Sequence, residues 1–158
     1  MVTAISNGLW GLRDAGCAED DIILVHDGVR PLVAERIITE NIEKCRKYGY
    51  AITGMICKEA IMQKVDDCVK NIDIPRERLV RTQTPHTYPL GTLLKAHAEA
   101  DAKGIDGTVA SCTLMAELGV DNQHLVMGSE KNGLKLTQTE DVELFKALKH
   151  TTKDEWLK

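Results

Sequence analysis

Apolar positions follow two different spacings along the chain, and these spacings predict strands and helices in turn. Ile22 to Val25 form a continuous apolar run, which is typical of a strand covered on both faces of a parallel sheet. Residues 51–57, "AITGMIC", predict a second buried strand. Apolar residues at helical spacing predict a helix over 34–47, which Gly49 can end. The stretch "HLVMGS" at 124–129 predicts a further short strand. Strands that alternate with helices indicate an α/β fold with a mostly parallel sheet and flanking helices.

Other segments show weaker versions of the same patterns. "GLKLT", residues 133–137, alternates apolar and polar positions and predicts an exposed or edge strand. Thr139 is placed to cap a last helix, whose first turn carries two acidic residues. Helices are also predicted over 5–16, 89–104 and 109–119, each ended by a glycine.

Residues 58–83 break this alternation. Polar and apolar side chains are mixed there, and Asp66-Asp67 is a turn signal typical of a hairpin tip. We interpret this segment as an antiparallel arm that leaves and rejoins the sheet. The chain is then predicted to be a single domain, 1–158, with an arm at about 58–83 that could pair two subunits.

Composition excludes several classes of protein. The formal charge is −4 with a pI near 5.7, which argues against a protein whose main partner is nucleic acid. The five cysteines include no Cys-x-x-Cys pair, so the sequence predicts neither a disulfide framework nor a zinc site. The first residues lack a signal-peptide pattern, and no apolar run reaches membrane-spanning length. We therefore expect a cytoplasmic protein with no membrane partner.

"ILVHDGVRP", residues 23–31, carries the most informative chemistry. Asp27 ends a predicted strand, where open α/β sheets bind their ligands. A carboxylate there suits a hard cation such as Mg²⁺, which takes few carboxylates and keeps phosphate or water ligands. Arg30 could bind a phosphate, and Pro31 stiffens the exit of the loop. The alternative is that Asp27 and Arg30 form a structural ion pair, and the spacing alone favours neither reading.

Three motifs in order give the chain a family resemblance. "LVHDGVRPLV" resembles the His-Asp-Ala-x-Arg-Pro signature of cytidylyltransferases that act on 2-C-methyl-D-erythritol 4-phosphate or D-ribitol 5-phosphate. "RERLVRTQTPHTY" resembles the family's arm arginine followed by Thr-Pro-Gln-x-Phe, and "NGLKLTQTEDVELFKAL" resembles its closing Asn-Ile-Lys segment. The resemblance implies a Rossmann-like fold of the nucleotide-diphospho-sugar transferase type, with an extended β-arm.

The resemblance also implies a reaction and a set of roles. Such enzymes join CTP to a polyol phosphate and release pyrophosphate, with Mg²⁺ as cofactor. The family pattern makes Asp27 the metal ligand, Arg30 the residue that braces its loop and Lys135 the group that neutralises the triphosphate. It assigns the polyol phosphate to Arg76 and Thr84, with Arg76 reaching over from the partner subunit of a homodimer joined through the arm.

Each of these residues also has a plain structural explanation. Lys135 could be a solvated lysine that protects a sheet edge, and Arg76 could lie in an exposed charged turn. Thr84 before a proline could be a turn residue. Neither His26 nor His86 is paired with a nucleophile in the sequence, so both are expected to be satisfied polar residues.

The chain departs from the family pattern at several positions. Glu59-Ala60 stands where relatives carry Asp-Thr, and His86 replaces the usual glutamine. The glycine-rich loop that cradles the CTP phosphates has no counterpart, so we expect an N-terminally truncated, partial domain with an uncovered sheet edge. The main hypothesis is a cytidylyltransferase. The alternatives are a catalytically silent remnant that dimerises and binds substrate, and an unrelated α/β domain in which Asp27 and Arg30 are only structural.

Overall fold

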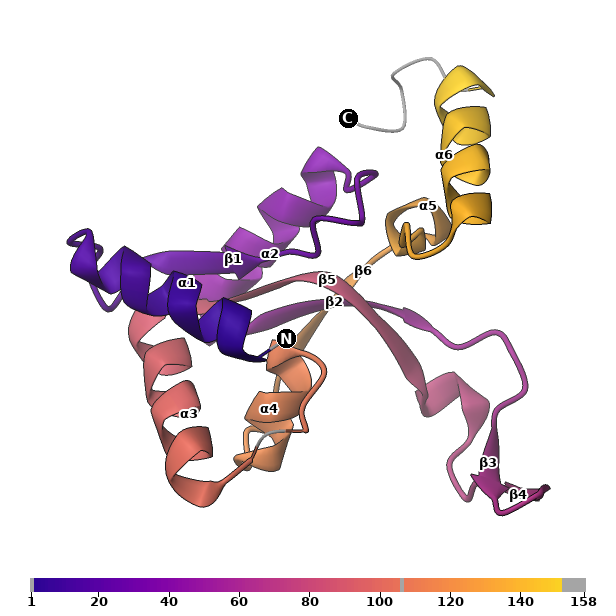
Figure 1. The fold of residues 1–158 in the computed structure, drawn as a ribbon, viewed down its shortest axis with the longest axis horizontal. Coiled ribbons are helices and arrows are strands. Elements are labelled where there is room, and N and C mark those ends of the chain that lie inside the picture. Colours follow the sequence, from indigo (N-terminus) through magenta and orange to yellow (C-terminus); the bar gives the residue numbers. More distant parts are fainter. Residues whose placement is uncertain (1, 106, 152–158) are drawn as a thin grey trace.

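A computed structural model describes residues 2–105 and 107–151 (Figure 1). Its strands are β1 (Ile22–Val25), β2 (Ala51–Ile56), β3 (Met62–Val65), β4 (Cys68–Asn71), β5 (Val80–Pro89) and β6 (His124–Met127). Its helices are α1 (Val2–Asp14), α2 (Glu35–Tyr48), α3 (Leu90–Lys103), α4 (Ser111–Glu117), α5 (Glu130–Gly133) and α6 (Thr139–Thr151), with a single 3₁₀ turn, η1 (Arg76–Arg78). None of the helices in the described part of the chain is long and apolar enough to span a membrane.

The main sheet has four strands in the order β1-β5-β2-β6. β2 runs parallel to β6, and β5 runs antiparallel to both β1 and β2, so β1, β2 and β6 share one direction. Three of the four strands therefore share one direction, although only β2 and β6 are parallel neighbours, and this mixed sheet with flanking helices confirms the predicted α/β fold class. The position of β5 between β1 and β2 was not predicted, because its polar sequence resembles an exposed segment.

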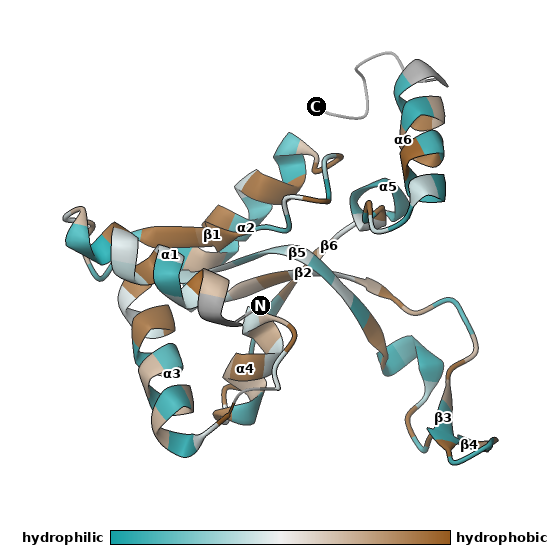
Figure 2. Ribbon diagram, in the orientation of Figure 1, coloured by the Kyte–Doolittle hydropathy of each residue, from teal (hydrophilic) through white to brown (hydrophobic). Residues whose placement is uncertain are grey.

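Two apolar clusters cover the two faces of the sheet. One joins α1, α3 and α4 to Tyr88 of β5, and the other joins α2 to Ala51 of β2 and Val126 of β6. Figure 2 shows β1 and β2 in the brown of apolar residues, whereas β5 between them is largely white and teal. The helices predicted from apolar periodicity are confirmed as α1 to α4, and Gly49 and Gly104 take the positive φ values that end α2 and α3.

β5 is interrupted where it passes the site described below. Ile52 pairs with His86, but the next residue, Thr53, pairs with Gln83. The two residues skipped on β5 are therefore Thr84 and Pro85, which are joined by a cis peptide bond. Such a bulge re-aims the side chains of a strand, and here it directs Thr84 toward the end of β1.

The arm is a two-stranded hairpin of β3 and β4 that extends away from the main sheet (Figure 1). Asp66 has a φ of +52° in its turn, which confirms the predicted hairpin tip. The chain returns through η1, and β5 begins at Val80, so the predicted arm boundary near residue 83 falls inside β5. The exposed apolar residues of the arm and its base are Ile56, Ile61, Met62, Val69, Ile74 and Val80.

Two local predictions are wrong. Residues 134–137 follow α5 without joining a strand, although their alternating pattern predicts an edge strand. Their backbone contacts a loop instead, because the N–H of Leu136 donates to the carbonyl of Val29 at 2.8 Å. Thr139 is the first residue of α6 rather than its cap. The Asp141 carboxylate caps this helix by accepting hydrogen bonds from the N–H groups of Thr137 and Gln138.

Candidate active site

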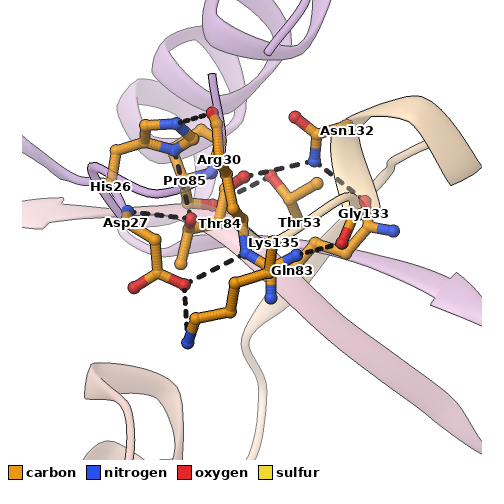
Figure 3. Close-up of polar contacts among 10 residues, drawn as sticks. All are labelled: His26, Asp27, Arg30, Thr53, Gln83, Thr84, Pro85, Asn132, Gly133 and Lys135. Atoms are coloured by element: carbon orange, nitrogen blue, oxygen red, sulfur yellow. Dashed lines mark hydrogen bonds and ion pairs between the residues drawn. The ribbon is translucent and has the colours of Figure 1, made fainter. Parts of the chain in front are cut away.

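Asp27 lies just beyond the carboxyl end of β1, as predicted. The pairing of β1 with β5 ends at Val25 opposite His86, and Asp27 follows two positions later in the chain. The N–H of Asp27 donates to the hydroxyl of Thr84 at 3.0 Å, so the bulge of β5 fixes the backbone of Asp27 (Figure 3). A backbone contact of this kind leaves the Asp27 carboxylate available to other groups.

Two cations contact that carboxylate. The Arg30 Nε donates to Asp27 Oδ2 at 3.0 Å, and the Lys135 Nζ lies 3.4 Å from the same oxygen. Arg30 also donates through Nη1 to the carbonyl of Gly133, which ties the loop after β1 to the segment that carries Lys135. The fold therefore brings Asp27, Arg30 and Lys135 together from distant parts of the chain (Figure 3).

The charges of the cluster set the ionisation of Asp27. Partial burial by itself would raise its pKa, but the hydrogen bond from Arg30 and the charge of Lys135 outweigh that effect and hold the pKa of Asp27 below its ordinary value. The carboxylate is thus ionised at neutral pH. With two cations around one anion, the cluster carries a net positive charge and is suited to bind a further anion.

His26 is satisfied on both ring nitrogens. Its Nε2 lies 2.9 Å from the carbonyl of Arg30, which can only accept, so Nε2 carries the proton. Its Nδ1 lies 3.1 Å from the Thr84 hydroxyl, within hydrogen-bond distance. His26 therefore braces the loop, as expected of a satisfied polar residue.

A buried amide pair behind the cluster was not predicted from the sequence. Asn132 donates to the side-chain carbonyl of Gln83 at 2.8 Å and to the backbone carbonyl of Thr84 at 3.2 Å. Gln83 donates in turn to the carbonyl of Ser129 at 2.9 Å. These bonds fix α5 against β5, and so they position the segment that leads to Lys135. The only signal for this pair in the sequence was that both amides lie within segments that resemble the family motifs.

The cluster opens into a cleft of about 350 Å³. Its polar wall comes from the cluster and from β5, and its far wall comes from α1 and the start of α4. The lining residues are Ile5, Val25, Asp27, Arg30, Thr82, Gln83, Thr84, His86, Val109, Ala110, Ser111 and Lys135. Cationic groups beside a cleft of this size suit a small phosphorylated ligand.

Arg76 does not join this cluster. It lies in η1 at the base of the arm, where its Nη1 donates to the carbonyl of Lys58 at 3.2 Å. It lines a second cavity, of about 650 Å³, between η1 and the hairpin. Within the described chain, the predicted site residues therefore separate into the cluster with Asp27, Arg30, Lys135 and Thr84, and Arg76 on the arm.

The residues that line the cleft include one carboxylate that could bind a metal ion, that of Asp27. The described residues contain no group of three or more His, Cys, Asp or Glu side chains that could hold an ion by themselves. Asp27 Oδ2 contacts both cations, whereas Oδ1 takes part in neither contact. This arrangement fits an ion such as Mg²⁺, which is bound by one or two carboxylates and completes its shell with substrate phosphates and water.

Comparisons with known proteins agree with the motifs. The family "IspD: 2-C-methyl-D-erythritol 4-phosphate cytidylyltransferase" matches residues 3–150. A ribitol-5-phosphate cytidylyltransferase of Lacticaseibacillus paracasei is 41% identical over 91% of this chain and 61% of its own length. A 2-C-methyl-D-erythritol 4-phosphate cytidylyltransferase of Clostridium acetobutylicum is 34% identical over 88% of this chain and 57% of its own length. The chain thus spans about 60% of the length of these relatives.

Solved structures show the same likeness. The 2-C-methyl-D-erythritol 4-phosphate cytidylyltransferase of Thermus thermophilus superposes with a TM-score of 0.78 at 26% identity, over 94% of this chain and 69% of that one. The corresponding enzyme of Francisella tularensis shows the same fold, with a TM-score of 0.81 at 23% identity, over 92% of this chain and 66% of that one. The sequence match, the motifs and the fold together place this chain in the IspD family of cytidylyltransferases.

Proposed function

We propose that this chain serves the transfer of a cytidylyl group from CTP to a polyol phosphate, with release of pyrophosphate. The contact of Lys135 with Asp27 at 3.4 Å, at the mouth of a cationic cleft, is the observation that carries the proposal. The names of the relatives supply the nucleotide and the class of acceptor. Both 2-C-methyl-D-erythritol 4-phosphate and D-ribitol 5-phosphate are retained as acceptors.

The proposed step needs no covalent intermediate on the protein. A phosphate oxygen of the polyol phosphate forms a bond to the α-phosphorus of CTP. The bond from that phosphorus to the oxygen bridging the α- and β-phosphates breaks, and pyrophosphate leaves with the electron pair. Lys135 would stabilise the negative charge on the transferring phosphates, and Arg30 would hold the Asp27 loop in position.

Asp27 is the residue that would hold Mg²⁺. The ion would supply charge neutralisation and orientation for the triphosphate. The ionised state of Asp27, held by its neighbouring cations, suits this role. Thr84 fixes the Asp27 backbone, and we propose that it also lies close to the polyol phosphate.

A second copy of the chain would complete the site through the arm. The hairpin of β3 and β4 pairs with no other strand of the described chain, and it exposes large apolar side chains such as Met62 and Val69. Surfaces of this kind are typical of subunit contacts. In the proposed homodimer, Arg76 at the base of one arm would reach the cleft of the other subunit. There its planar guanidinium group would bind two oxygens of the polyol phosphate.

The direct test is CTP-dependent release of pyrophosphate with each polyol phosphate in the presence of Mg²⁺. We expect Asp27→Asn and Lys135→Met each to lower the rate by roughly 100-fold, the usual effect of removing one electrostatic contact to a transition state. Lys146→Met is the control, because Lys146 pairs with Glu143 on the surface of α6, away from the cleft. If the chain binds neither CTP nor a polyol phosphate, the proposal is wrong. Binding of both without pyrophosphate release would favour the catalytically silent alternative.

A further inference from the structure

His86 is a buried histidine in the wall of the cleft, and one of its ring nitrogens has no partner among the described residues. Its side chain belongs to β5, it is 2% exposed, and it lines the same cleft as Asp27 and Lys135. Within the described chain, no group donates to or accepts from its Nε2. A buried polar atom without a partner costs free energy. Such an atom beside a cleft therefore suggests that a ligand or a water molecule in the cleft is its partner.

The chemistry of that nitrogen follows from the state of the ring. Burial lowers the pKa of His86 to about 4, so the ring is neutral at pH 7. A neutral imidazole carries one proton, so Nε2 takes part in a hydrogen bond as a donor or as an acceptor, depending on the tautomer. A hydroxyl group can also do both, and so it complements Nε2 in either case.

A second unpartnered group lines the same cleft. The hydroxyl of Ser111, at the start of α4, belongs to a residue that is 3% exposed, and it has no hydrogen-bond partner among the described residues. The cleft thus has a cationic part, formed by Arg30 and Lys135, and an uncharged part with free hydrogen-bonding capacity. A ligand with a phosphate at one end and hydroxyl groups along its chain matches both parts.

We infer that Nε2 of His86 forms a hydrogen bond with a hydroxyl of the polyol phosphate, and that His86 is a specificity-determining residue of the cleft. The inference rests on the proposed function, and it adds a contact that distinguishes a hydroxylated chain from a bare phosphate. It also gives a role to the histidine that stands where the family motif has glutamine, because the residue at this position lines the cleft.

His97 provides a matched control. It is also a histidine, it is also 2% exposed, and both of its ring nitrogens lack partners among the described residues. However, it lines a smaller neighbouring cavity that contains neither Asp27 nor Lys135, although the two cavities share the residues Ile5, Val109, Ala110 and Ser111. Replacing His97 should affect packing as strongly as replacing His86 without removing a group from the cleft.

The test measures dissociation constants for D-ribitol 5-phosphate, 2-C-methyl-D-erythritol 4-phosphate and inorganic phosphate by calorimetry, with the full chain and its variants. The ratio of the constant for phosphate to that for a polyol phosphate reports the contacts of the polyol chain beyond its phosphate. We expect His86→Leu to lower this ratio by about tenfold, the size of one hydrogen bond, for at least one polyol phosphate. His86→Gln, which keeps a hydrogen-bonding group, should restore most of it, and His97→Leu should leave it unchanged. Thermal unfolding of each variant verifies that it is folded.

The outcomes separate the inference from the proposed function. If the unaltered chain prefers a polyol phosphate to phosphate and His86→Leu keeps that preference, the inference is wrong while the proposed function stands. A loss of preference in His97→Leu equal to that in His86→Leu would also overturn it, because the effect would then come from packing. If the unaltered chain shows no preference for either polyol phosphate, the proposed acceptor is wrong as well.

Discussion

The hydroxyl of Thr84 accepts a hydrogen bond from the N–H of Asp27 at 3.0 Å and lies 3.1 Å from Nδ1 of His26. One short side chain on β5 thereby holds both residues that follow β1. Since the Asp27 N–H can only donate, the hydroxyl oxygen accepts from it. The position of Asp27 therefore depends on the bulge of β5 as much as on its own strand.

Replacing Thr84 tests this dependence. In Thr84→Val, the N–H of Asp27 and Nδ1 of His26 both lose their partner, and a partly buried group left unsatisfied costs about 1–3 kcal/mol. We expect the free energy of unfolding in urea to fall by this amount, and binding of CTP to weaken. Thr84→Ser keeps the hydroxyl and should stay close to the unaltered chain. A loss in Thr84→Ser without a loss in Thr84→Val would show that the methyl group, and not the hydroxyl, matters.

Arg30 should be essential for joining the two loops of the site. Arg30→Met removes the contacts to Asp27 and to the Gly133 carbonyl, and we expect a loss of about 1–3 kcal/mol in the free energy of unfolding. Hydrogen exchange at the Leu136 amide should become faster, because its bond to Val29 connects the same loops. Arg30→Lys keeps the charge but lacks the fork, so an intermediate rate is expected. An unchanged exchange rate in Arg30→Met would contradict this account.

Acidification should weaken the fold first through His86, and at lower pH through Asp27. The pKa of His86 falls from 6.5 to about 4 on folding, so the unfolded chain binds more protons between these values, and stability is lost as the pH falls from 6.5 to about 4. At about 1.4 kcal/mol per pKa unit this loss is roughly 3 kcal/mol. His86→Gln should remove it, which urea unfolding from pH 7 to pH 4 would measure. A pH dependence that is the same in the variant would assign the effect to other groups.

The contribution of Asp27 should disappear at lower pH. Its pKa is lowered in the folded state, so its stabilising effect is present above the ordinary value of 3.8 and is lost as the pH falls through the lowered value. The difference in unfolding free energy between the unaltered chain and Asp27→Asn should therefore stay constant from pH 7 to pH 5 and shrink below pH 4. A difference that already shrinks near pH 6 would mean that Asp27 is not held ionised by Arg30 and Lys135.

The arm should control the oligomeric state. Ile74 on the arm and Leu144 on α6 are both 51% exposed, so their replacement by aspartate costs similar burial in a single chain. We expect Ile74→Asp to shift the sedimentation behaviour from dimer to monomer, and Leu144→Asp to leave it unchanged. Because Arg76 would act across the dimer, Ile74→Asp should also weaken binding of the polyol phosphate. A monomeric unaltered chain would refute the dimer.

Strong apolar periodicity predicted most of the fold. The helices α1 to α4 and the strands β1, β2 and β6 lie close to where their apolar residues predicted them. β5 was not foreseen as a central strand because Gln83, His86 and Thr87 are polar, and sequence reasoning places such residues outside. They are buried because polar partners on other elements satisfy most of them, such as Asn132 for Gln83 and Asn41 for Thr87.

The site was predictable only in part. Asp27 and Arg30 stand out at the end of an apolar run, whereas Lys135 was assigned by family resemblance, since its alternating surroundings suggested an edge strand. The structure brings it to Asp27 from a segment outside the sheet. The free nitrogen of His86 and the pair of Gln83 with Asn132 were missed, because nothing in a linear sequence shows which buried polar atom finds a partner and which does not.

The contact of Arg30 with the Gly133 carbonyl joins groups 103 positions apart in the chain. Contacts of such long sequence separation require closure of the intervening chain, which has an entropic cost. The cleft is therefore complete only when the loop after β1 and the segment after α5 are both in place. Ligand binding should depend on both segments together, and a bound phosphate should raise the free energy of unfolding of the whole chain.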